Sequence, residues 1–356
     1  MHDYLTQRGG AERVVLSLLA AFPDAPVYTS VYEPESTFPE FRAREIHTTA
    51  LNRFPPFRRW HRTALPVLAP TFSRLDVPGD VVVCSSSGWA HGAHVSGRKV
   101  VYCHTPARWL YQTGRYLDGS RSLRRVALEA LRRPLEAWDK RAAATASRYL
   151  VNSTAVQRRV RELYGIDAEV LPPPPAVTPD GPVEAVEGVD DDFFLCVSRL
   201  LPYKNVDAVT AALRELPGER LVVVGSGPDR ARLAATAPPN VRFVASPSDP
   251  ELRWLYAHAR ALVAASYEDF GLTPLEAASF GKPVAVLRWG GFLDTVRESE
   301  TGVFFEEPTP PQIAVALRCI LETSWEVETV LAHAASFAED RFVERVRVIV
   351  AEEARA

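Results

Sequence analysis

Residues 221–229 read Leu221-Val222-Val223-Val224-Gly225-Ser226-Gly227-Pro228-Asp229, a continuous apolar run that ends in a glycine-rich turn. An apolar run without alternation predicts a strand that is buried on both faces, the kind found in parallel sheets. Residues 284–287 read Val284-Ala285-Val286-Leu287 and repeat the pattern. Such strands need helices on both faces of their sheet. The stretch therefore predicts a doubly wound α/β fold.

Short apolar segments alternate with helical segments along the whole chain, which extends this prediction to both halves. Strands are expected near 26–30, 80–84, 98–103, 148–152 and 168–171, and again near 192–197, 220–224, 241–244, 261–265, 284–287 and 302–305. Between the two sets lies Leu171-Pro172-Pro173-Pro174-Pro175. Consecutive prolines can neither continue a helix nor join a central strand. The sequence therefore predicts two domains, 1–175 and 183–325, with a semi-rigid linker that suits a hinge.

The composition fits two soluble domains in the cytoplasm. The 356 residues are 47% hydrophobic, enough for two cores. No apolar run has transmembrane length, and no secretory leader is recognisable. The four cysteines, Cys84, Cys103, Cys196 and Cys319, are scattered, and three of them lie in or beside apolar, strand-like stretches. Reduced, buried thiols fit this distribution better than disulfides or a zinc site.

Charge is unevenly distributed along the chain. Residues 1–171 carry 24 Lys and Arg against 16 Asp and Glu, a net charge of +8. The arginines concentrate in two stretches, Arg53, Arg58, Arg59 and Arg62, then Arg121, Arg124, Arg125, Arg132 and Arg133. They fit two solvated helix faces as well as a surface that meets an anionic membrane or a lipid-phosphate acceptor, peripherally at the inner membrane face. Nucleic acid is not expected, because no nucleic-acid-binding motif is present.

Two motifs in the first half could carry chemistry. Gly9-Gly10-Ala11-Glu12 opens an apolar helix, and paired glycines at a helix start let backbone amides approach a phosphate. A plain helix start explains this motif equally well. His104 lies at the carboxyl end of the strand 98–103, where ligands bind, although a lone histidine is more often structural. The chain opens at Met1-His2-Asp3-Tyr4-Leu5 and reaches the glycine pair at once, so the strand expected ahead of such a loop is predicted to be missing, either truncated or excluded by a start that is placed late.

The second half offers a cationic loop and a glycine turn. Ser198-Arg199-Leu200-Leu201-Pro202-Tyr203-Lys204-Asn205 follows a strand, and its two cations could hold the diphosphate of a leaving group without a metal. Two surface cations on a loop are the alternative. Gly225 and Gly227 would let a base or ribose lie close, although tight strand-to-helix turns use glycine anyway.

The most informative motif is Ser266-Tyr267-Glu268-Asp269-Phe270-Gly271-Leu272-Thr273-Pro274-Leu275-Glu276. Thr273 suits an N-cap, Pro274 the first helical position and Glu276 the acid of a capping box, so Glu276 has a purely structural explanation. Glu268 has no such explanation. On a loop after an apolar strand, its carboxylate could accept hydrogen bonds from sugar hydroxyls while helix amides face phosphates.

No metal site is expected. His91 and His94 have a spacing compatible with a metal ion, but no third ligand is apparent. The acidic triplet Asp190-Asp191-Asp192 precedes a strand and is expected to be a solvated edge of the second domain.

Taken in order, these motifs resemble the family-4 retaining glycosyltransferases of the GT-B fold, in which two Rossmann-like domains face each other across a cleft. The resemblance covers nearly the whole chain. It rests on His2-Asp3-Tyr4-Leu5 with Gly9-Gly10-Ala11-Glu12-Arg13, His104-Thr105-Pro106, Ser198-Arg199 with Lys204-Asn205, Gly225-Ser226-Gly227-Pro228, Glu268 through Ala277, Gly281-Lys282-Pro283 and Gly290-Gly291. The family's first strand precedes the His-Asp-Tyr segment, and this chain departs from the pattern there.

The resemblance implies a role for each matched residue. Arg199 and Lys204 would hold the donor diphosphate, Glu268 would contact sugar hydroxyls, and His104 would lie beside the reacting face of the sugar. The remaining donor-binding residues would be Gly9, Gly10, Gly225, Gly227, Asp269, Phe270, Gly271, Leu272, Thr273 and, at the ribose, Glu276. No metal and no cofactor is implied, and a C-terminal helix near 339–353 would pack back on the first domain.

The implied reaction transfers a hexose from a nucleoside diphosphate sugar to a hydroxyl of a carbohydrate, lipid-linked or small-molecule acceptor by front-face substitution. The wording Glu268-Asp269-Phe270-Gly271 is similar to the mannosyltransferase branch, which favours GDP-mannose as the donor. Two alternatives remain open: a non-catalytic nucleotide-sugar-binding protein, and a sugar-nucleotide epimerase or sugar phosphorylase on the same fold.

Overall fold

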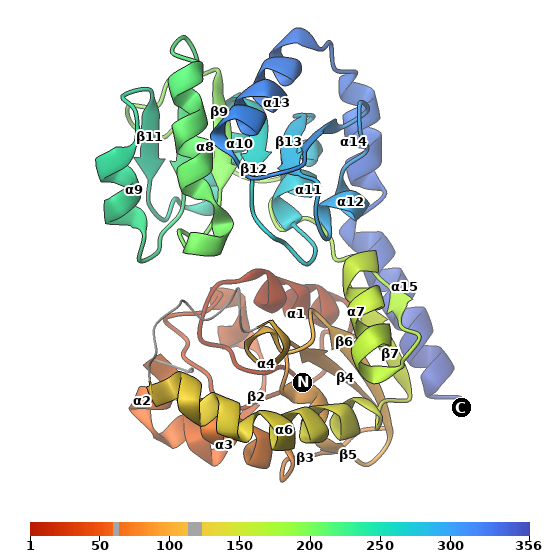
Figure 1. Ribbon diagram of the computed structural model, residues 1–356. Coiled ribbons are helices and arrows are strands. Elements are labelled where there is room, and N and C mark those ends of the chain that lie inside the picture. The colour runs from red at the N-terminus through yellow and green to blue at the C-terminus, as the bar shows by residue number, and fades with distance from the viewer. Residues whose placement is uncertain (60–63, 113–122) are drawn as a thin grey trace. The chain divides into compact units, whose positions relative to one another are not determined.

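The computed structural model describes residues 1–59, 64–112 and 123–356. The chain divides into two compact units (Figure 1). Unit 1 contains Met1–Pro173 together with Glu339–Ala356, and unit 2 contains Pro174–Ala338. The chain passes from unit 1 to unit 2 inside the proline run and returns for its last helix.

Unit 2 is built on a parallel sheet with the strand order β11-β10-β9-β12-β13-β14. The strands are β9 (Phe193–Val197), β10 (Leu221–Val224), β11 (Val241–Val244), β12 (Ala259–Ala264), β13 (Val284–Leu287) and β14 (Gly302–Phe305). The chain moves outward from β9 to β11 and then restarts on the other side of β9 with β12. This is the Rossmann order, and its switch point lies between β9 and β12.

Helices cover both faces of this sheet, as the continuous apolar strands require. They are α8 (Val206–Ala212), α9 (Arg230–Thr236), α10 (Asp249–His258), α11 (Leu272–Ser279), α12 (Phe292–Thr295), α13 (Pro310–Glu322) and α14 (Val327–Ala335). Helices α8 and α13 lie side by side over one face (Figure 1). Val222, Val223, Ala285 and Val286 are all at most 3% exposed. The prediction of strands buried on both faces is therefore confirmed.

Unit 1 repeats the theme with less regular strands. A sheet with the order β4-β6-β7-β8 and a pair β1-β2 are parallel throughout, and a small pair β3-β5 lies apart from them. The strands are β1 (Val27–Thr29), β2 (Ile46–Thr48), β3 (Asp76–Val77), β4 (Val81–Ser86), β5 (His94–Val95), β6 (Arg98–Cys103), β7 (Arg148–Val151) and β8 (Glu169–Val170). Every strand expected from the sequence is present within two residues. Strands β2, β3 and β5 were not expected.

The first residues occupy the place where the sequence analysis expected a missing strand. His2 forms parallel bridges to Thr29 of β1 on one side and to Ser85 of β4 on the other. The amide of His2 donates to Tyr28 O at 2.9 Å, and Met1 O accepts from the amide of Ser85 at 2.9 Å. The expectation of a wholly absent strand is therefore corrected: this short segment joins β1 to β4, which extends the order to β2-β1-(His2)-β4-β6-β7-β8.

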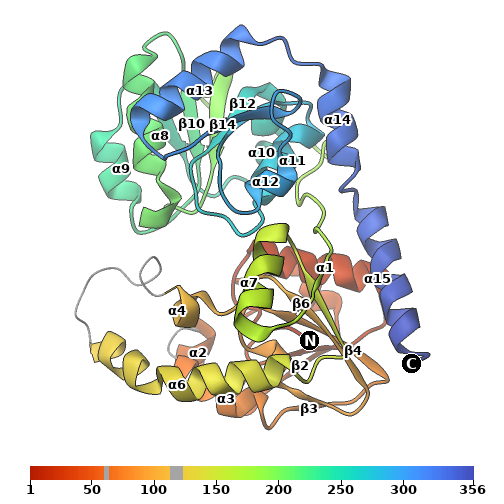
Figure 2. The ribbon, with the colours of Figure 1, turned by 45° about the vertical axis from the view of Figure 1, so that its right-hand side comes forward.

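Helices of unit 1 include one that comes from the far end of the chain. They are α1 (Gly10–Ala21), α2 (Pro55–Arg59), α3 (Leu65–Phe72), α4 (Arg108–Tyr111), α6 (Leu123–Ala143), α7 (Thr154–Tyr164) and α15 (Glu339–Glu353). Figure 2 shows α15 beside α1. Its buried face, with Phe342, Val346 and Ile349, packs into one cluster with Val14 and Tyr102. None of the helices within the described ranges is long and apolar enough to cross a membrane.

Candidate functional site

The two loops singled out in the second half emerge at the switch point of the unit 2 sheet. Residues 198–205 follow β9, and residues 265–271 follow β12, its neighbour in the sheet. Asn205 ties the loops together, since its Nδ2 donates to Ala265 O at 2.8 Å. Crevices at such switch points bind ligands in open α/β sheets, because adjacent loops diverge there to opposite faces.

Lys204 and Glu268 form an ion pair across these loops. Lys204 Nζ contacts Glu268 Oε1, and Ser266 Oγ donates to the same carboxylate oxygen at 3.1 Å. The Lys204 side chain is 8% exposed and that of Glu268 is 22% exposed. A buried ammonium needs a charged partner, so the ion pair holds both side chains in place between the two loops.

Arg199 lies on the same loop but is exposed. Its Nη2 donates to Tyr203 Oη at 3.2 Å. The Tyr203 ring lies 5.1 Å from Lys204 Nζ, a cation–π distance. The loop thus places both cations against Tyr203: the exposed Arg199 contacts its hydroxyl, and the buried Lys204 lies near its ring.

Glycines let neighbouring loops approach these residues closely. A Cβ on Gly225 would lie 1.9 Å from Ser198 O, and one on Gly227 would lie 2.2 Å from Leu200 O. Both glycines also have positive φ angles, 143° and 159°. The turn after β10 therefore lies directly against the Arg199 loop, and only glycine fits at both positions.

A second pair of glycines supports the Glu268 loop from β13. The amide of Gly291 donates to Glu268 O at 3.1 Å. A Cβ on Gly290 would lie 2.1 Å from the same oxygen, and one on Gly291 would lie 2.2 Å from Phe270 Cα. Asp269 and Phe270 are at most 5% exposed, so the loop backbone is fixed from both sides.

Helix α11 begins earlier than the sequence analysis expected. Gly271, at φ 86° and ψ 85°, is the N-cap, and Leu272 is the first helical residue. The interpretation of Thr273 as N-cap and Pro274 as first helical residue is therefore wrong, and so is the capping box. The reason is a close approach: a Cβ at position 271 would lie 2.4 Å from the Phe292 ring, which selects glycine and its left-handed conformation.

Glu276 consequently lies in the second turn of α11, where it cannot cap the helix. It is 6% exposed, and its Oε2 accepts a hydrogen bond of 2.5 Å from Tyr256 Oη on α10. Tyr256 is fully buried, so a neighbouring helix fixes the orientation of this carboxylate.

In unit 1, Gly9 is the N-cap of α1 and Gly10 its first residue. Glu12, in the first turn, is 1% exposed, and its Oε1 accepts from Gln7 Nε2 at 3.1 Å. A Cβ on Gly9 would lie 2.6 Å from Glu12 Oε2. The carboxylate therefore folds back under the glycine pair, where the helix dipole favours a negative charge.

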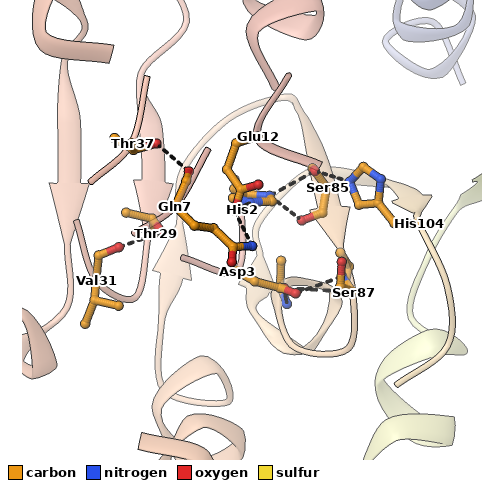
Figure 3. Close-up of polar contacts among 12 residues, drawn as sticks. His2, Asp3, Gln7, Glu12, Thr29, Val31, Thr37, Ser85, Ser87 and His104 are labelled. Carbon is orange, nitrogen blue, oxygen red and sulfur yellow. Dashed lines mark hydrogen bonds and ion pairs between the residues drawn. The ribbon is translucent and has the colours of Figure 1, made fainter. Parts of the chain in front are cut away.

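His104 belongs to a buried polar chain that starts at the first residues (Figure 3). His104 Nε2 lies 2.8 Å from Ser85 Oγ, and His2 Nδ1 lies 3.0 Å from the same hydroxyl. His2 Nε2 in turn lies 3.8 Å from Glu12 Oε1. Burial, with a smaller contribution from the nearby His2, lowers the pKa of His104 to about 3, so the ring is neutral at physiological pH.

A second set of buried polar contacts involves Asp3 and Ser86, the residues that follow His2 and Ser85 along the chain. Asp3 accepts backbone hydrogen bonds from Ser87 at 2.7 Å and Ala90 at 2.6 Å, and burial raises its pKa. Ser86 Oγ lies 2.9 Å from His91 Nδ1, whose Nε2 lies 3.0 Å from Asp139 Oδ1. His91 is therefore part of the fold, and His94 is an exposed partner of Asp76.

Other residues named in the sequence analysis have simpler surroundings. Arg53 and Arg59 are exposed, and Arg132 pairs with Glu136 at 2.8 Å. Arg62 and Arg121 lie outside the described residues, as do the side chains of Arg124 and Arg125. Asp190 and Asp192 pair with Arg220 and Arg260. Within the described ranges, no group of three or more His, Cys, Asp and Glu is placed to hold a metal.

A hollow of about 480 Å³ lies elsewhere in unit 1. Its lining includes Ser147, Arg148 and Glu169, at the amino ends of β7 and β8. Ligands of α/β sheets bind at the carboxyl ends of the strands, so this hollow is separate from the loops above.

Comparison with known proteins identifies both units. The family described as "Glycosyltransferase Family 4" matches residues 8–174, and that described as "Glycosyl transferases group 1" matches residues 183–336. The chain belongs to glycosyltransferase family 4. The two matches follow one another along this family-4 chain and leave only the proline-rich segment 175–182 between them.

Curated relatives differ in the length that they share with this chain. A D-inositol 3-phosphate glycosyltransferase of Acidothermus cellulolyticus is 29% identical over 238 residues, 57% of this chain and 52% of the relative. The chain thus spans about half the length of this relative. A GDP-mannose-dependent alpha-mannosyltransferase of Mycobacterium tuberculosis is 28% identical over 364 residues, 91% of this chain and 92% of the relative.

Solved structures agree on the fold of this chain. Anabaena HepE in complex with UDP and glucose matches with a TM-score of 0.69 and 17% identity, over 98% of this chain and 99% of the other. The lipopolysaccharide outer core galactosyltransferase WaaB matches with a TM-score of 0.63, also at 17% identity, over 96% of each chain. The two Rossmann-like units are therefore those of the GT-B fold, as predicted.

Several residues of the contacts described above gave no signal in the sequence. Ser85 lies at the end of a strand that was expected to stop at 84, and Ser266 and Tyr256 carry no motif of their own. His2 belonged to a matched motif, but nothing in its neighbours along the chain indicates that it contacts residue 85.

Proposed function

We propose that this protein transfers a hexosyl group from a nucleoside diphosphate sugar to a hydroxyl acceptor with retention of configuration and without a metal. The observation that carries the proposal is the Lys204–Glu268 ion pair at the switch point of unit 2, with Arg199 on the same loop. Cations and a carboxylate adjoin there at the carboxyl ends of neighbouring strands. Loops arranged in this way can bind a phosphate and a sugar hydroxyl side by side.

In this proposal, the diphosphate binds to Arg199 and Lys204. Arg199 is exposed and can turn to a ligand, and Lys204 is already held in place by Glu268. The N-terminal amides of α11, at Leu272 and Thr273, add a partial positive charge at the same edge. As the bond to the sugar breaks, these groups stabilise the charge that develops on the departing diphosphate.

Glu268 is proposed to accept hydrogen bonds from the donor sugar, with Asp269, Phe270 and Gly271 forming the adjoining backbone. Glu276, oriented by Tyr256, is proposed to bind the ribose. Gly225 and Gly227, whose missing side chains let the turn after β10 pack against the Arg199 loop, are proposed to adjoin the nucleoside. In unit 1, Gly9 and Gly10 are proposed to approach the phosphates and His104 to contact the sugar.

The proposed step is a front-face substitution. The acceptor oxygen forms a bond to the anomeric carbon while the bond from that carbon to the diphosphate oxygen breaks, both on the same face of the sugar. The acceptor's proton moves to an oxygen of the leaving diphosphate, so no enzyme nucleophile is consumed. Rate then depends on positioning and on stabilisation of the leaving charge.

GDP-mannose is the donor we propose. It is supported by the Glu268-Asp269-Phe270-Gly271 motif. It is also supported by the relative named for GDP-mannose, because the match covers 92% of that relative. A thermal-shift series with GDP, UDP, ADP and dTDP tests the base, because a ligand that binds the folded state raises the melting temperature. A larger shift with UDP than with GDP would refute this choice of donor.

Three substitutions test the transfer proposal. Arg199→Ala and Lys204→Ala are expected to lower turnover at least a hundredfold, since each removes a charge that stabilises the leaving group. Glu268→Gln is expected to lower turnover while the nucleoside diphosphate still binds. Arg318→Ala, which removes an exposed arginine 42% accessible in the same unit, is the control.

The variants also separate chemistry from folding. Arg199→Ala should leave the melting temperature unchanged, because the side chain is exposed. Lys204→Ala leaves the Glu268 carboxylate without its cation and is expected to destabilise unit 2 by about 2 kcal/mol. Near-normal turnover in Arg199→Ala would overturn the diphosphate assignment. Donor binding without transfer or hydrolysis in the wild type would favour a binding protein, and a requirement for free phosphate a phosphorylase.

A further inference from the structure

Three side chains from three separate segments meet in the interior of unit 1. They are His2 of the first segment, Ser85 of β4 and His104 after β6, with exposed fractions of 1%, 0% and 9%. Ser85 Oγ lies 2.8 Å from His104 Nε2 and 3.0 Å from His2 Nδ1 (Figure 3). The hydroxyl thus stands between the two rings.

The backbone oxygen of Ser85 fixes the direction of these hydrogen bonds. His2 Nδ1 also lies 3.2 Å from Ser85 O, and a carbonyl oxygen can only accept. His2 Nδ1 therefore carries a proton and donates to both oxygens of Ser85. The single proton of the Ser85 hydroxyl is then free to be donated to His104 Nε2.

The opposite direction would leave a buried group unpaired. If His104 Nε2 carried the proton, the Ser85 hydroxyl would accept from both rings, and its own proton would have no acceptor among the described residues. An unmade hydrogen bond at a fully buried hydroxyl is unfavourable by an amount comparable to the bond itself. The arrangement with Ser85 donating to His104 satisfies all three groups.

We propose that Ser85 and His2 are positioning residues that hold His104 as the neutral Nδ1–H tautomer, so that its Nδ1 donates a hydrogen bond to an oxygen of the bound sugar. This inference rests on the proposed function. It assigns roles to two residues outside the cationic loop and makes His104 a hydrogen-bond donor, not a proton acceptor.

The surroundings of His104 support this assignment. Among the described residues, only Ser85 forms a hydrogen bond with the His104 ring, so Nδ1 stays available to a ligand. The backbone is fixed separately: the amide of His104 donates to Ser86 O at 2.9 Å, and Asn152 Nδ2 donates to His104 O at 3.0 Å. Burial lowers the pKa of His104 to about 3, so a second proton does not bind at neutral pH.

Glu12 and Gln7 complete the positioning chain behind His2. Glu12 Oε1 lies 3.8 Å from His2 Nε2 and accepts from Gln7 Nε2 at 3.1 Å. Since Glu12 lies in the first turn of α1, this contact brings the start of that helix next to His2.

A neutral donor suits front-face transfer for two reasons. It places no full positive charge beside a sugar carbon that becomes electron-poor as its bond to phosphate breaks. It also cannot remove the acceptor's proton, which leaves a phosphate oxygen as the base. The fixed tautomer thus separates the sugar contact from the proton transfer.

The tautomer can be measured directly in the full-length protein by long-range ¹H–¹⁵N NMR of the imidazole rings. The His104 signals are assigned by their loss in His104→Gln. We expect a pyrrole-type Nδ1 and a pyridine-type Nε2 at neutral pH. Ser85→Ala should move the population toward Nε2–H, whereas Ser85→Thr keeps the hydroxyl and should keep the tautomer.

His2 offers a matched pair of variants. Asparagine places an amide N–H near the position of Nδ1, so His2→Asn should keep the Nδ1–H tautomer, and His2→Leu should lose it. Ser86→Ala removes the neighbouring hydroxyl of β4, which contacts His91 instead, and should leave the His104 signals unchanged. These variants keep the test decisive should Ser85→Ala fail to fold.

Turnover supplies the second readout. Ser85→Ala and His2→Leu are expected to lower kcat about tenfold with KM nearly unchanged, the effect of one misdirected hydrogen bond, and Ser85→Thr and His2→Asn should restore it. An Nε2–H tautomer in a wild-type protein that transfers sugar would overturn this inference and leave the proposed function standing. An Nδ1–H tautomer in a wild-type protein that transfers no sugar would support the tautomer assignment and overturn the proposed function.

Discussion

Burial of His104 ties the stability of the protein to pH. Because its pKa of about 3 lies below the unfolded value of 6.5, the unfolded chain takes up the proton first as pH falls. The free energy of unfolding should therefore decrease below pH 6.5, by up to about 1.4 kcal/mol per pH unit from this residue. His104→Gln is expected to flatten that dependence, measured by urea unfolding between pH 4.5 and 7.5.

The difference between the wild type and His104→Gln in the pH dependence of the free energy of unfolding separates His104 from other titrating groups. Burial also lowers the pKa of His333, so part of the acid sensitivity should persist in the variant. His94→Gln is the control, because that side chain is 72% exposed and should not alter the slope. An unchanged slope in His104→Gln would show that the ring is already charged, or reaches solvent, in the folded state.

At the residue scale, the sequence indicates which side chains carry chemistry better than it indicates what they touch. Lys204 and Glu268 were assigned from their loops, but their contact joins residues 64 positions apart. That contact depends on β9 and β12 being neighbours, and no local pattern specifies strand order. Glu276 shows the opposite failure, since a motif typical of a capping box was overridden by the Phe292 ring against Gly271.

At the scale of elements, the turn after β10 supports the cationic loop after β9. The amide of Leu200 donates to Ser226 O at 2.9 Å, and that of Ser198 donates to Val224 O at 2.9 Å. The strands of this unit were predictable because each is a mainly apolar run of at least four residues. The precise approach of two loops was not, because it depends on the absence of side chains rather than on any pattern.

Gly225→Ala tests this support. The new Cβ would meet Ser198 O at 1.9 Å at a φ of 143°, so the loop that carries Arg199 has to move. We expect a loss of about 2 kcal/mol in stability and at least a tenfold weaker affinity for the nucleoside diphosphate. Calorimetric titration and thermal unfolding measure the two effects.

Gly218→Ala provides the control within unit 2. A Cβ at Gly218 meets nothing within 4 Å, so stability should change by less than about 0.5 kcal/mol and affinity should not change. Should Gly225→Ala bind the nucleotide as tightly as Gly218→Ala does, the turn after β10 would have no part in shaping the site.

At the scale of the whole molecule, the chain closes unit 1 with its last segment. Ser17 Oγ donates to Glu339 Oε1 at 2.7 Å, Arg347 Nε donates to Ala21 O at 3.0 Å, and Arg98 pairs with Glu353 at 2.9 Å. The division into two α/β halves could be predicted from strand spacing and the proline run. The place of His2 between β1 and β4 could not, because a segment that pairs only through isolated bridges at His2 and Leu5 has no strand periodicity.

This connectivity predicts that core substitutions in α15 destabilise unit 1, although this helix is distant in sequence from the rest of the unit. Ile349 is 0% exposed in the cluster with Val14 and Tyr102, so Ile349→Ala should lower the stability of unit 1 by about 3 kcal/mol. Val348→Ala, at a neighbouring position 41% exposed, should change it by less than about 0.5 kcal/mol. Hydrogen exchange read by mass spectrometry should show faster exchange in β4, β6 and α1 of Ile349→Ala, with β9 to β14 unaffected. Equal acceleration in both units would mean that α15 does not belong to the folding unit of residues 1–173, because its loss would then propagate through the chain as a whole.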